Sequence, residues 1–320
     1  MVNRKGSAGA IPAAGSETRR PPELVDAQCP IPGWLAAEFP FTPRILRLSA
    51  GAHMAFLDEG SHQGRAVLML HGNPTWSFFY HNLVRTLAPS ARCIAPDHIG
   101  MGLSDKPPHH DYSLAGRIAD LESLVAALGL RRLDLVVHDW GGAVGCGLAA
   151  RHPGLIDRLV ILNTAAFIST RLPARIAACR VPLLGPLLVR GANLFAWPAT
   201  WMAMHRRTLT PLQRRAYLHP YDSWEHRVGI DAFVQDIPMR PSHPSWPTLR
   251  EIERYLPRLR DRPALIVWGG RDFCFNDHFL ARWREILPEA QTKRIADAGH
   301  YVLEDAGDQA IRLISDFLRQ

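Results

Sequence analysis

The segment Leu133–Gly142 reads LDLVVHDWGG, and it decides how the rest of the sequence is interpreted. A nearly unbroken apolar run, typical of a buried strand, ends at His138 and Asp139 and passes at once into two glycines. The small residues AVGCGLAA that follow favour a helix. A sharp strand-turn-helix of this kind usually presents one reactive side chain, and here that side chain is Asp139.

Strand-like and helical runs alternate on both sides of this segment. The runs that resemble β-strands are 44–50, 53–59, 66–72, 92–97, 132–138, 158–163, 264–269 and 292–297. Amphipathic stretches lie between them, such as 114–130, in which apolar residues recur at helical spacing. This alternation predicts an α/β fold with a mainly parallel sheet flanked by helices.

Two segments interrupt the alternation. Residues 1–35 are rich in Pro, Ala, Gly and Ser without periodicity, so we expect a disordered or loosely docked tail. Residues 168–250 contain many prolines, arginines and tryptophans but no convincing strand, which predicts a helical cap. We expect this cap to lie over the carboxyl ends of the strands, where open α/β sheets bind ligands. The predicted core then comprises residues 36–167 and 251–320. Within the predicted cap, the aromatic residues Phe195, Trp197 and Trp201 either line an apolar pocket or pack the cap helices against one another.

The composition argues against several other classes of protein. The chain has 320 residues, of which 47% are hydrophobic and 21% charged, as is usual for a soluble globular protein. Its net charge is +7, but the excess arginines are scattered and no nucleic-acid motif is present, so we expect no nucleic-acid partner. Five cysteines without a CxxC pair indicate neither a disulfide framework nor a zinc site and favour a cytoplasmic location. No segment is typical of a signal peptide or a membrane span.

Two further residues extend the pattern around Asp139. His300 lies in AGHYVLED, after the last predicted strand, and Asp272 lies in WGGRDFCF, after the strand before it. Nucleophile, acid and histidine in that order match a hydrolase triad. Asp139 could merely cap the following helix, but three such residues, each at the carboxyl end of a strand, favour a catalytic triad.

An aspartate nucleophile works differently from a serine. A carboxylate, with an ordinary pKa of about 3.9, is already ionised at neutral pH and needs no base to activate it. Asp139 can therefore attack an electrophilic carbon directly. His300 would then deprotonate a water that attacks the covalent intermediate, while Asp272 orients and charges its imidazole.

Two donors are expected beside the nucleophile. HGNPTWSFFY follows the third predicted strand, where a loop amide is expected to form an oxyanion hole and Asn73 adds a side-chain amide. Trp140 supplies an indole N–H. Together they could stabilise a departing halide or a carboxylate oxygen. The alternatives are an Asn-Pro turn for Asn73 and a core aromatic role for Trp140.

Together, HGNPTWSFF, PDHIGMGLSDKP, VHDWGGA, ILNTAAF, GGRDFCF and AGHYVLEDA resemble the haloalkane dehalogenase group of α/β-hydrolases over about residues 38–320. PYDSWEHRVGIDAFVQDIP and RDFCFNDHFL are more similar to one branch of it, the β-lactone decarboxylases of bacterial long-chain olefin biosynthesis. The resemblance implies Asp139 as nucleophile, His300 as the histidine and Asp272 as the acid. It places Asn73 and Trp140 where dehalogenases bind halide. Some dehalogenases draw the acid from the segment after the sixth strand, but this sequence has NTAAF there, without a carboxylate.

The decarboxylase branch implies a particular reaction. A cis-3,4-dialkyl β-lactone (oxetan-2-one) loses its carboxyl carbon and leaves a cis-alkene, and no metal or organic cofactor is needed. The resemblance also implies a small apolar substrate and association with the β-lactone synthetase and other enzymes of the olefin pathway. Attack by Asp139 at the carbonyl carbon and at the alkyl carbon are both compatible with the sequence.

Three other functions are compatible with parts of this pattern. A haloalkane dehalogenase shares the whole set of site residues. An epoxide hydrolase would use Tyr217 or Tyr221 as a proton donor, but such enzymes usually carry an aromatic residue at the position of Asn73. A non-catalytic receptor with this fold would not need an intact triad.

Overall fold

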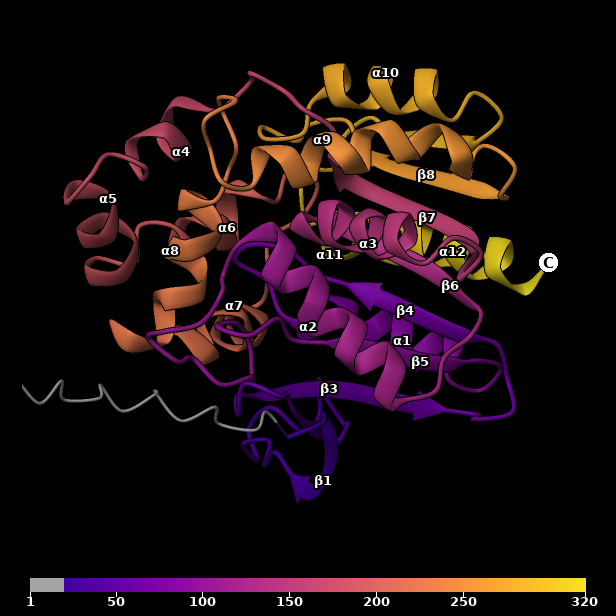
Figure 1. Ribbon diagram of the computed structural model, residues 1–320, viewed down its shortest axis with the longest axis horizontal. Helices are drawn as coiled ribbons and strands as arrows, with labels where there is room; N and C mark the ends of the chain where they lie inside the picture. The colour runs from indigo at the N-terminus through magenta and orange to yellow at the C-terminus, as the bar shows by residue number, and fades with distance from the viewer. Residues whose placement is uncertain (1–19) are drawn as a thin grey trace, which may run out of the picture.

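A single nine-stranded sheet forms the centre of the molecule (Figure 1). The computed structural model describes residues 20–320. The strands are β1 (Glu23–Gln28), β2 (Arg44–Arg47), β3 (His53–Gly60), β4 (Ala66–Leu70), β5 (Arg92–Pro96), β6 (Leu133–Asp139), β7 (Ile156–Thr164), β8 (Ala264–Gly269) and β9 (Gln291–Ile295). Their order in the sheet is β1-β2-β3-β5-β4-β6-β7-β8-β9. The six strands from β5 to β9 in this order are parallel, and β1 to β3 are joined antiparallel, which confirms the predicted α/β fold.

Helices cover both faces of the sheet. The core helices are α1 (His81–Leu87), α2 (Leu114–Ala127), α3 (Trp140–Arg151), α9 (Trp246–Tyr255), α10 (Asp277–Ile286), α11 (Val302–Asp305) and α12 (Asp308–Arg319), with short 3₁₀ turns η1 (Ser77–Tyr80) and η5 (Leu256–Leu259). Local signals set several of their ends. For example, the Ser113 side chain accepts a hydrogen bond from the N–H of Gly116 and so caps α2.

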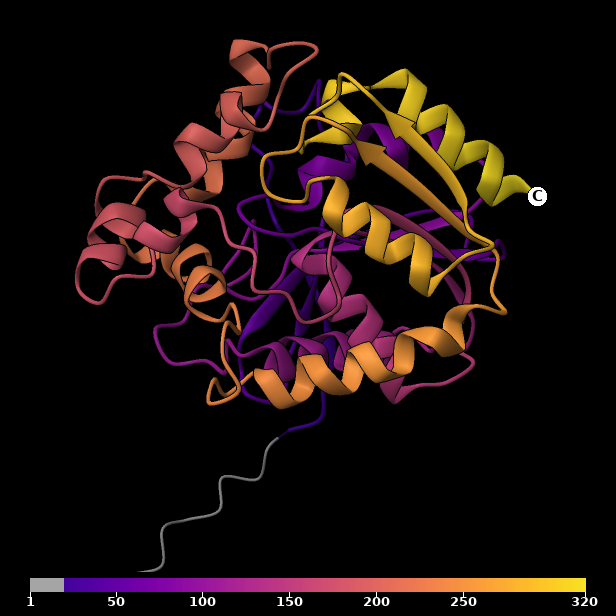
Figure 2. The same cartoon turned by 90° about the horizontal axis from the view of Figure 1, so that it is seen from above.

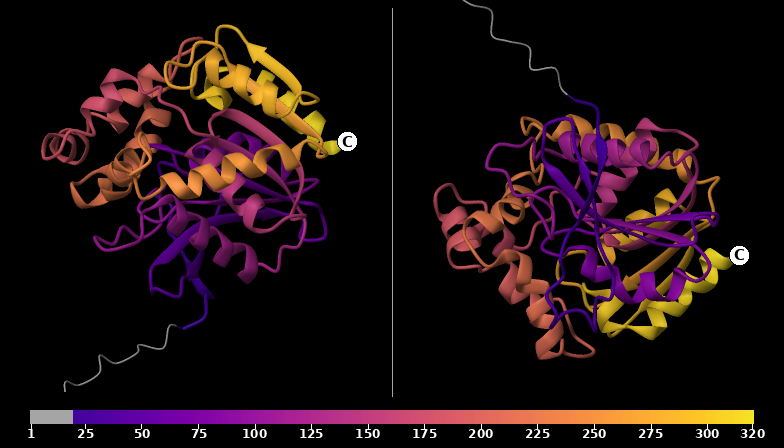
Figure 3. Two further views of the ribbon diagram at one scale, coloured as in Figure 1. Left: turned by 45° about the horizontal axis from the view of Figure 1, so that its top comes forward. Right: turned by 90° about the horizontal axis from the view of Figure 1, so that it is seen from below.

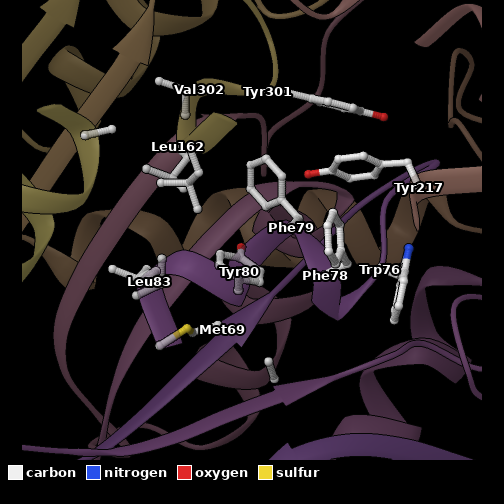
Figure 4. Packing of buried hydrophobic residues seen from close by; sticks show 14 of the residues in the cluster. Met69, Trp76, Phe78, Phe79, Tyr80, Leu83, Leu162, Tyr217, Tyr301 and Val302 are labelled. Carbon is white, nitrogen blue, oxygen red and sulfur yellow. The ribbon is translucent and has the colours of Figure 1, made fainter. Parts of the chain in front are cut away.

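Alternate residues of the central strands point to opposite layers. Val67 and Met69 of β4 belong to the apolar cluster that includes residues of α1 and α12, part of which is drawn in Figure 4. Leu68 and Leu70 belong to the cluster on the other face, which includes residues of α2, α3, α9 and α10. Because both faces are buried, these strands read as continuous apolar runs in the sequence.

The predicted cap is present between β7 and α9. It comprises α4 (Ala174–Ala178), α5 (Leu184–Pro186), η2 (Leu187–Gly191), α6 (Ala196–Met202), α7 (Pro211–Leu218), η3 (His219–Tyr221), η4 (Glu225–Arg227) and α8 (Val228–Gln235). These helices lie beyond the end of the sheet toward which the arrowheads of β4 and β7 point (Figure 1), and Figure 2 shows them at one side of the core. Helix α9 begins inside the predicted cap range but packs on α3 and α2, so it belongs to the core.

The predicted tail over 1–35 is wrong for its last part. Strand β1 pairs antiparallel with β2 at the edge of the sheet, and Leu35 is fully buried in the core. A short edge strand gains hydrogen bonds from its neighbour without needing an apolar pattern of its own, so its sequence gives little sign of it. Residues 1–19 lie outside the described residues.

Figure 3 gives two further views, with the cap at one end of the sheet. Among residues 20–320, no helix is long and apolar enough to cross a membrane.

Candidate active site

Strand β6 ends at Asp139 and α3 begins at the next residue, so the predicted sharp turn is present. Asp139 has φ 50° and ψ −127°, a backbone conformation that costs a non-glycine residue energy and often marks a functional position. The Thr164 hydroxyl of β7 donates a hydrogen bond to the Asp139 carbonyl and holds the turn. Gly141 is needed because a Cβ there would overlap the backbone carbonyl of Leu70 in β4.

The three predicted triad residues meet at this turn. Asp272 follows β8 and His300 follows β9, and both side chains are buried, as is Asp139. His300 Nδ1 lies 2.7 Å from Asp272 Oδ2, and His300 Nε2 lies 3.8 Å from Asp139 Oδ2. Because a carboxylate can only accept, Nδ1 carries the proton toward Asp272 and Nε2 faces the nucleophile. The loop N–H of Cys274 donates to Asp272 Oδ1 at 2.7 Å and fixes that carboxylate.

The site combines burial with opposing charges. Burial raises the pKa of Asp139 above its ordinary value, although the His300 charge and the backbone N–H groups of Asn73 and Trp140 oppose the rise. Burial by itself would lower the pKa of His300, but the charge and hydrogen bond of Asp272 outweigh it and raise that pKa. The arrangement therefore favours a positively charged His300 between two carboxylates.

Asn73 and Trp140 both lie beside the nucleophile, and Asn73 differs in part from the expectation. The backbone N–H of Asn73 donates to Asp139 Oδ1 at 2.6 Å, so this loop amide is already engaged by the nucleophile. Asn73 Nδ2 donates to the carbonyl of Ile230 in α8 at 3.1 Å, which leaves its second hydrogen for a ligand. Trp140 follows the nucleophile directly, as the first residue of α3, and lines the cavity described next.

A cavity of about 480 Å³ adjoins the nucleophile. Asn73, Asp139, Trp140 and His300 line it, and the remaining lining is mostly apolar. One group of apolar side chains comes from the cap and includes Ile176, Phe195 and Met202. A second group comes from the core and includes Ala143, Leu249 and Phe279. The cavity therefore presents one ionised nucleophile and a few N–H donors to an otherwise apolar ligand.

Other residues named from the sequence lie away from the cavity. Tyr217 donates to Glu304 Oε1 at 2.8 Å, and Tyr221 donates to the carbonyl of Thr75 at 3.1 Å. Neither lines the cavity, so neither is placed to protonate an epoxide oxygen. Of the three cap aromatics, Phe195 lines the cavity, whereas Trp197 and Trp201 are exposed.

Asp305 supports the site, although no sequence pattern points to it. Its carboxylate accepts the N–H of Gly299 at 2.6 Å, next to His300, and the N–H groups of His205 and Arg207 in the cap, each at 2.9 Å. One buried carboxylate thus joins the histidine loop to the cap. The only sequence signal was an acidic residue shortly after His300, which by itself indicates nothing about its partners.

Comparisons with known proteins find relatives that cover most of the chain. The family model of the alpha/beta hydrolase fold matches residues 65–307. A cis-3-alkyl-4-alkyloxetan-2-one decarboxylase of Shewanella oneidensis is 46% identical, over 84% of this chain and 86% of the relative. A haloalkane dehalogenase of Mycolicibacterium paratuberculosis is 31% identical, over 87% of this chain and 93% of the relative. The crystal structure of a haloalkane dehalogenase from Bradyrhizobium elkani superposes with a TM-score of 0.77 at 26% identity, covering 84% of this chain and 94% of that one.

Proposed function

The chain belongs to the α/β-hydrolase family, and on that premise we propose that it converts cis-3-alkyl-4-alkyloxetan-2-ones to cis-alkenes by decarboxylation. The observation that carries the proposal is Asp139, an ionisable nucleophile held against His300 beside an apolar cavity. The higher identity to the decarboxylase than to the dehalogenase supports the lactone as substrate.

In the first step Asp139 opens the ring. Its Oδ2 attacks the alkyl ring carbon C4, so that a C4–O bond to Asp139 forms and the C4–O bond of the ring breaks. The released electron pair stays on the lactone carboxylate. Oδ1 keeps its hydrogen bond from the backbone N–H of Asn73, so Oδ2 is the oxygen free to attack. The second hydrogen of Asn73 Nδ2 and the indole N–H of Trp140 then donate hydrogen bonds to the new carboxylate.

In the second step the ester eliminates. The bond between C3 and the carboxyl carbon breaks and releases CO₂, its electrons form the C3–C4 double bond, and Asp139 leaves as a carboxylate. No water, metal or redox partner takes part, and the nucleophile is regenerated. A positively charged His300 stabilises the departing Asp139 anion, and Asp272 keeps His300 charged. Inversion in the first step and anti elimination in the second convert a cis-lactone into a cis-alkene.

The cavity suits a substrate with two alkyl chains. Its two apolar groups of side chains, one from the cap and one from the core, give each chain a separate surface to contact. Burying apolar surface contributes roughly 25 cal/mol per Å², so the long alkyl chains of the substrate would provide most of its binding free energy. The lactone ring is the part that reacts with Asp139.

Haloalkane hydrolysis is the second candidate. Two N–H donors beside an anionic nucleophile would also hold a halide ion. After alkyl transfer, His300 would have to act as a base toward water, which requires its neutral form. The predicted association with a lactone synthetase and the cytoplasmic location stay predictions.

The test is product analysis with purified full-length protein. Gas chromatography measures alkene from a cis-3,4-dialkyl β-lactone, and a parallel assay measures halide released from 1-bromoalkanes. We expect alkene as the main product and little halide. Asp139→Asn is the control and should lose turnover by orders of magnitude, whereas a non-catalytic receptor would keep its binding. Halide release without alkene would replace the proposal with the second candidate.

A further inference from the structure

The cap carries an unusual concentration of exposed apolar side chains. Of the nine large hydrophobic residues that are exposed among residues 20–320, eight lie in the cap. Six of them define what we call the cap apolar patch: Leu183, Leu184, Leu187, Leu194, Trp197 and Trp201. Scattered exposed leucines are ordinary on protein surfaces, but a concentration of this kind within about twenty residues indicates an interaction surface.

The patch is displayed rather than incompletely buried. Leu183 is 86% exposed and Leu187 is 59% exposed. Leu183 has a φ of 65°, an unfavourable conformation for a leucine, in a turn closed by the N–H of Gly185 on the carbonyl of Val181 at 2.7 Å. The turn leads into α5, which lies with α4 at the edge of the cap farthest from the sheet (Figure 1). The chain therefore holds an apolar side chain outward at an energetic cost.

The charge of the same segment has one sign. Residues 168–205 contain Arg171, Arg175, Arg180 and Arg190 and no acidic residue. Over the whole cap, residues 168–250, eleven arginines face four acidic residues, a net charge of +7 that leaves the rest of the chain formally neutral. Exposed leucine and tryptophan combined with unbalanced arginine is the composition of surfaces that lie on anionic lipid.

The patch and the cavity lining share a residue. Leu194 is an exposed member of the patch and also lines the cavity. Arg171 and Arg175, from the same cationic segment, line the cavity too and are exposed. If another apolar surface covers the patch, a ligand that leaves this surface can therefore enter the cavity without passing through bulk water.

We propose that the cap apolar patch docks this protein on an anionic lipid bilayer surface, so that apolar ligands exchange directly between the lipid and the cavity. The leucines and tryptophans enter the boundary between headgroups and acyl chains, where tryptophan is enriched, and the arginines contact lipid phosphates. The positive charge of this segment favours an anionic bilayer over a second copy of the chain as the partner of the patch, because two cationic patches placed face to face would repel each other.

Vesicle co-sedimentation of the full-length protein tests the proposal. One set of vesicles contains phosphatidylcholine alone, and the other also contains phosphatidylglycerol. We expect wild type to sediment with the anionic vesicles, to bind neutral ones more weakly, and to lose affinity as salt concentration rises. The Leu183→Asp/Leu187→Asp variant should bind roughly tenfold more weakly or worse, because each substitution removes apolar burial and adds a repelled charge.

Matched controls separate docking from folding. Leu24→Asp alters an exposed leucine of β1, which is 37% exposed, and should bind vesicles as wild type does. Leu183→Asp alone, at a side chain that is almost wholly exposed, should fold normally and still weaken binding. Neither Leu183 nor Leu187 lines the cavity, so activity on a detergent-dispersed substrate should persist in both patch variants.

Three results would overturn the proposal: wild type that stays in the supernatant with both vesicle types, patch variants that bind as wild type does, or patch-dependent dimers in light scattering without vesicles. The vesicle measurement uses no substrate. Its failure would therefore leave the proposed lactone chemistry intact, and failure of that chemistry would leave the vesicle result intact.

Discussion

The backbone N–H of Asn73 donates a hydrogen bond of 2.6 Å to Oδ1 of Asp139. In a serine enzyme of this family the equivalent loop amide is free to stabilise an oxyanion. Here it orients the nucleophile and leaves Oδ2 toward His300. The two carboxylate oxygens therefore have different tasks, because Oδ1 is held by the loop amide and Oδ2 faces His300.

The first prediction concerns Gly72, which precedes Asn73. A Cβ at this position would overlap the Asp139 side chain, including Oδ1. We expect Gly72→Ala to displace the nucleophile and to lower kcat by roughly 100-fold, the effect of an ångström-scale misplacement. Gly33→Ala is the control, because a Cβ there would meet no atom within 4 Å. Alkene production and thermal midpoints of both variants check this, and a Gly72→Ala enzyme with wild-type kcat would contradict the assigned geometry.

The second prediction concerns pH. Asp272 raises the pKa of His300, and the proposed elimination needs His300 charged. The turnover of lactone should therefore be full between the pKa of Asp139, which must be ionised to attack, and the raised pKa of His300, and it should fall as pH rises through the pKa of His300. Asp272→Asn removes the charge that raises this pKa, so the fall should move to lower pH, with a reduced maximal rate.

Asp105→Asn serves as the control for that shift. Asp105 pairs with His53 at 3.0 Å on the protein surface, so its loss alters a histidine-aspartate pair away from the cavity. Its pH profile should match wild type. A lactone profile that stays flat as the pH rises through the raised pKa of His300 would mean that turnover does not need a charged His300.

The third prediction concerns solvent oxygen. Elimination regenerates Asp139 without water, so turnover of lactone in H₂¹⁸O should leave the peptide that contains Asp139 unlabelled. Hydrolysis of an alkyl ester would place ¹⁸O in that carboxylate, and any turnover of a 1-bromoalkane provides the positive control. Mass spectrometry of the digested protein reads both results. Label that accumulates in Asp139 with the lactone would exclude elimination as the main route.

Sequence patterns predict the strands and the order of the triad because both depend on local chemistry. Apolar runs of the right length mark β4 to β8, and the turn after β6 requires the glycines that follow Asp139. Edge strand β1 was missed because its hydrogen bonds to β2, rather than its own pattern, hold it in place.

The positions of side chains in the cap could not be predicted in the same way. Tyr217 and Trp197 both belong to short cap helices, yet one is buried against Glu304 and the other faces solvent. The difference comes from how the cap packs on the core, which no periodicity in the sequence reports. The same holds for Asp305, whose carboxylate joins the nearby Gly299 to a cap segment, His205 and Arg207, that lies about 100 residues earlier in the sequence.

The most direct test of the central claim is the mass of the covalent intermediate. Without the charge of His300, departure of Asp139 should slow, so His300→Ala should accumulate an ester when mixed with the cis-lactone. His226→Ala, which alters an exposed histidine paired with Asp222 at 2.6 Å, should not accumulate it. The account predicts an adduct with the mass of the intact lactone on the peptide that contains Asp139. An adduct on Cys274, which also lines the cavity, or no adduct at all, would contradict it.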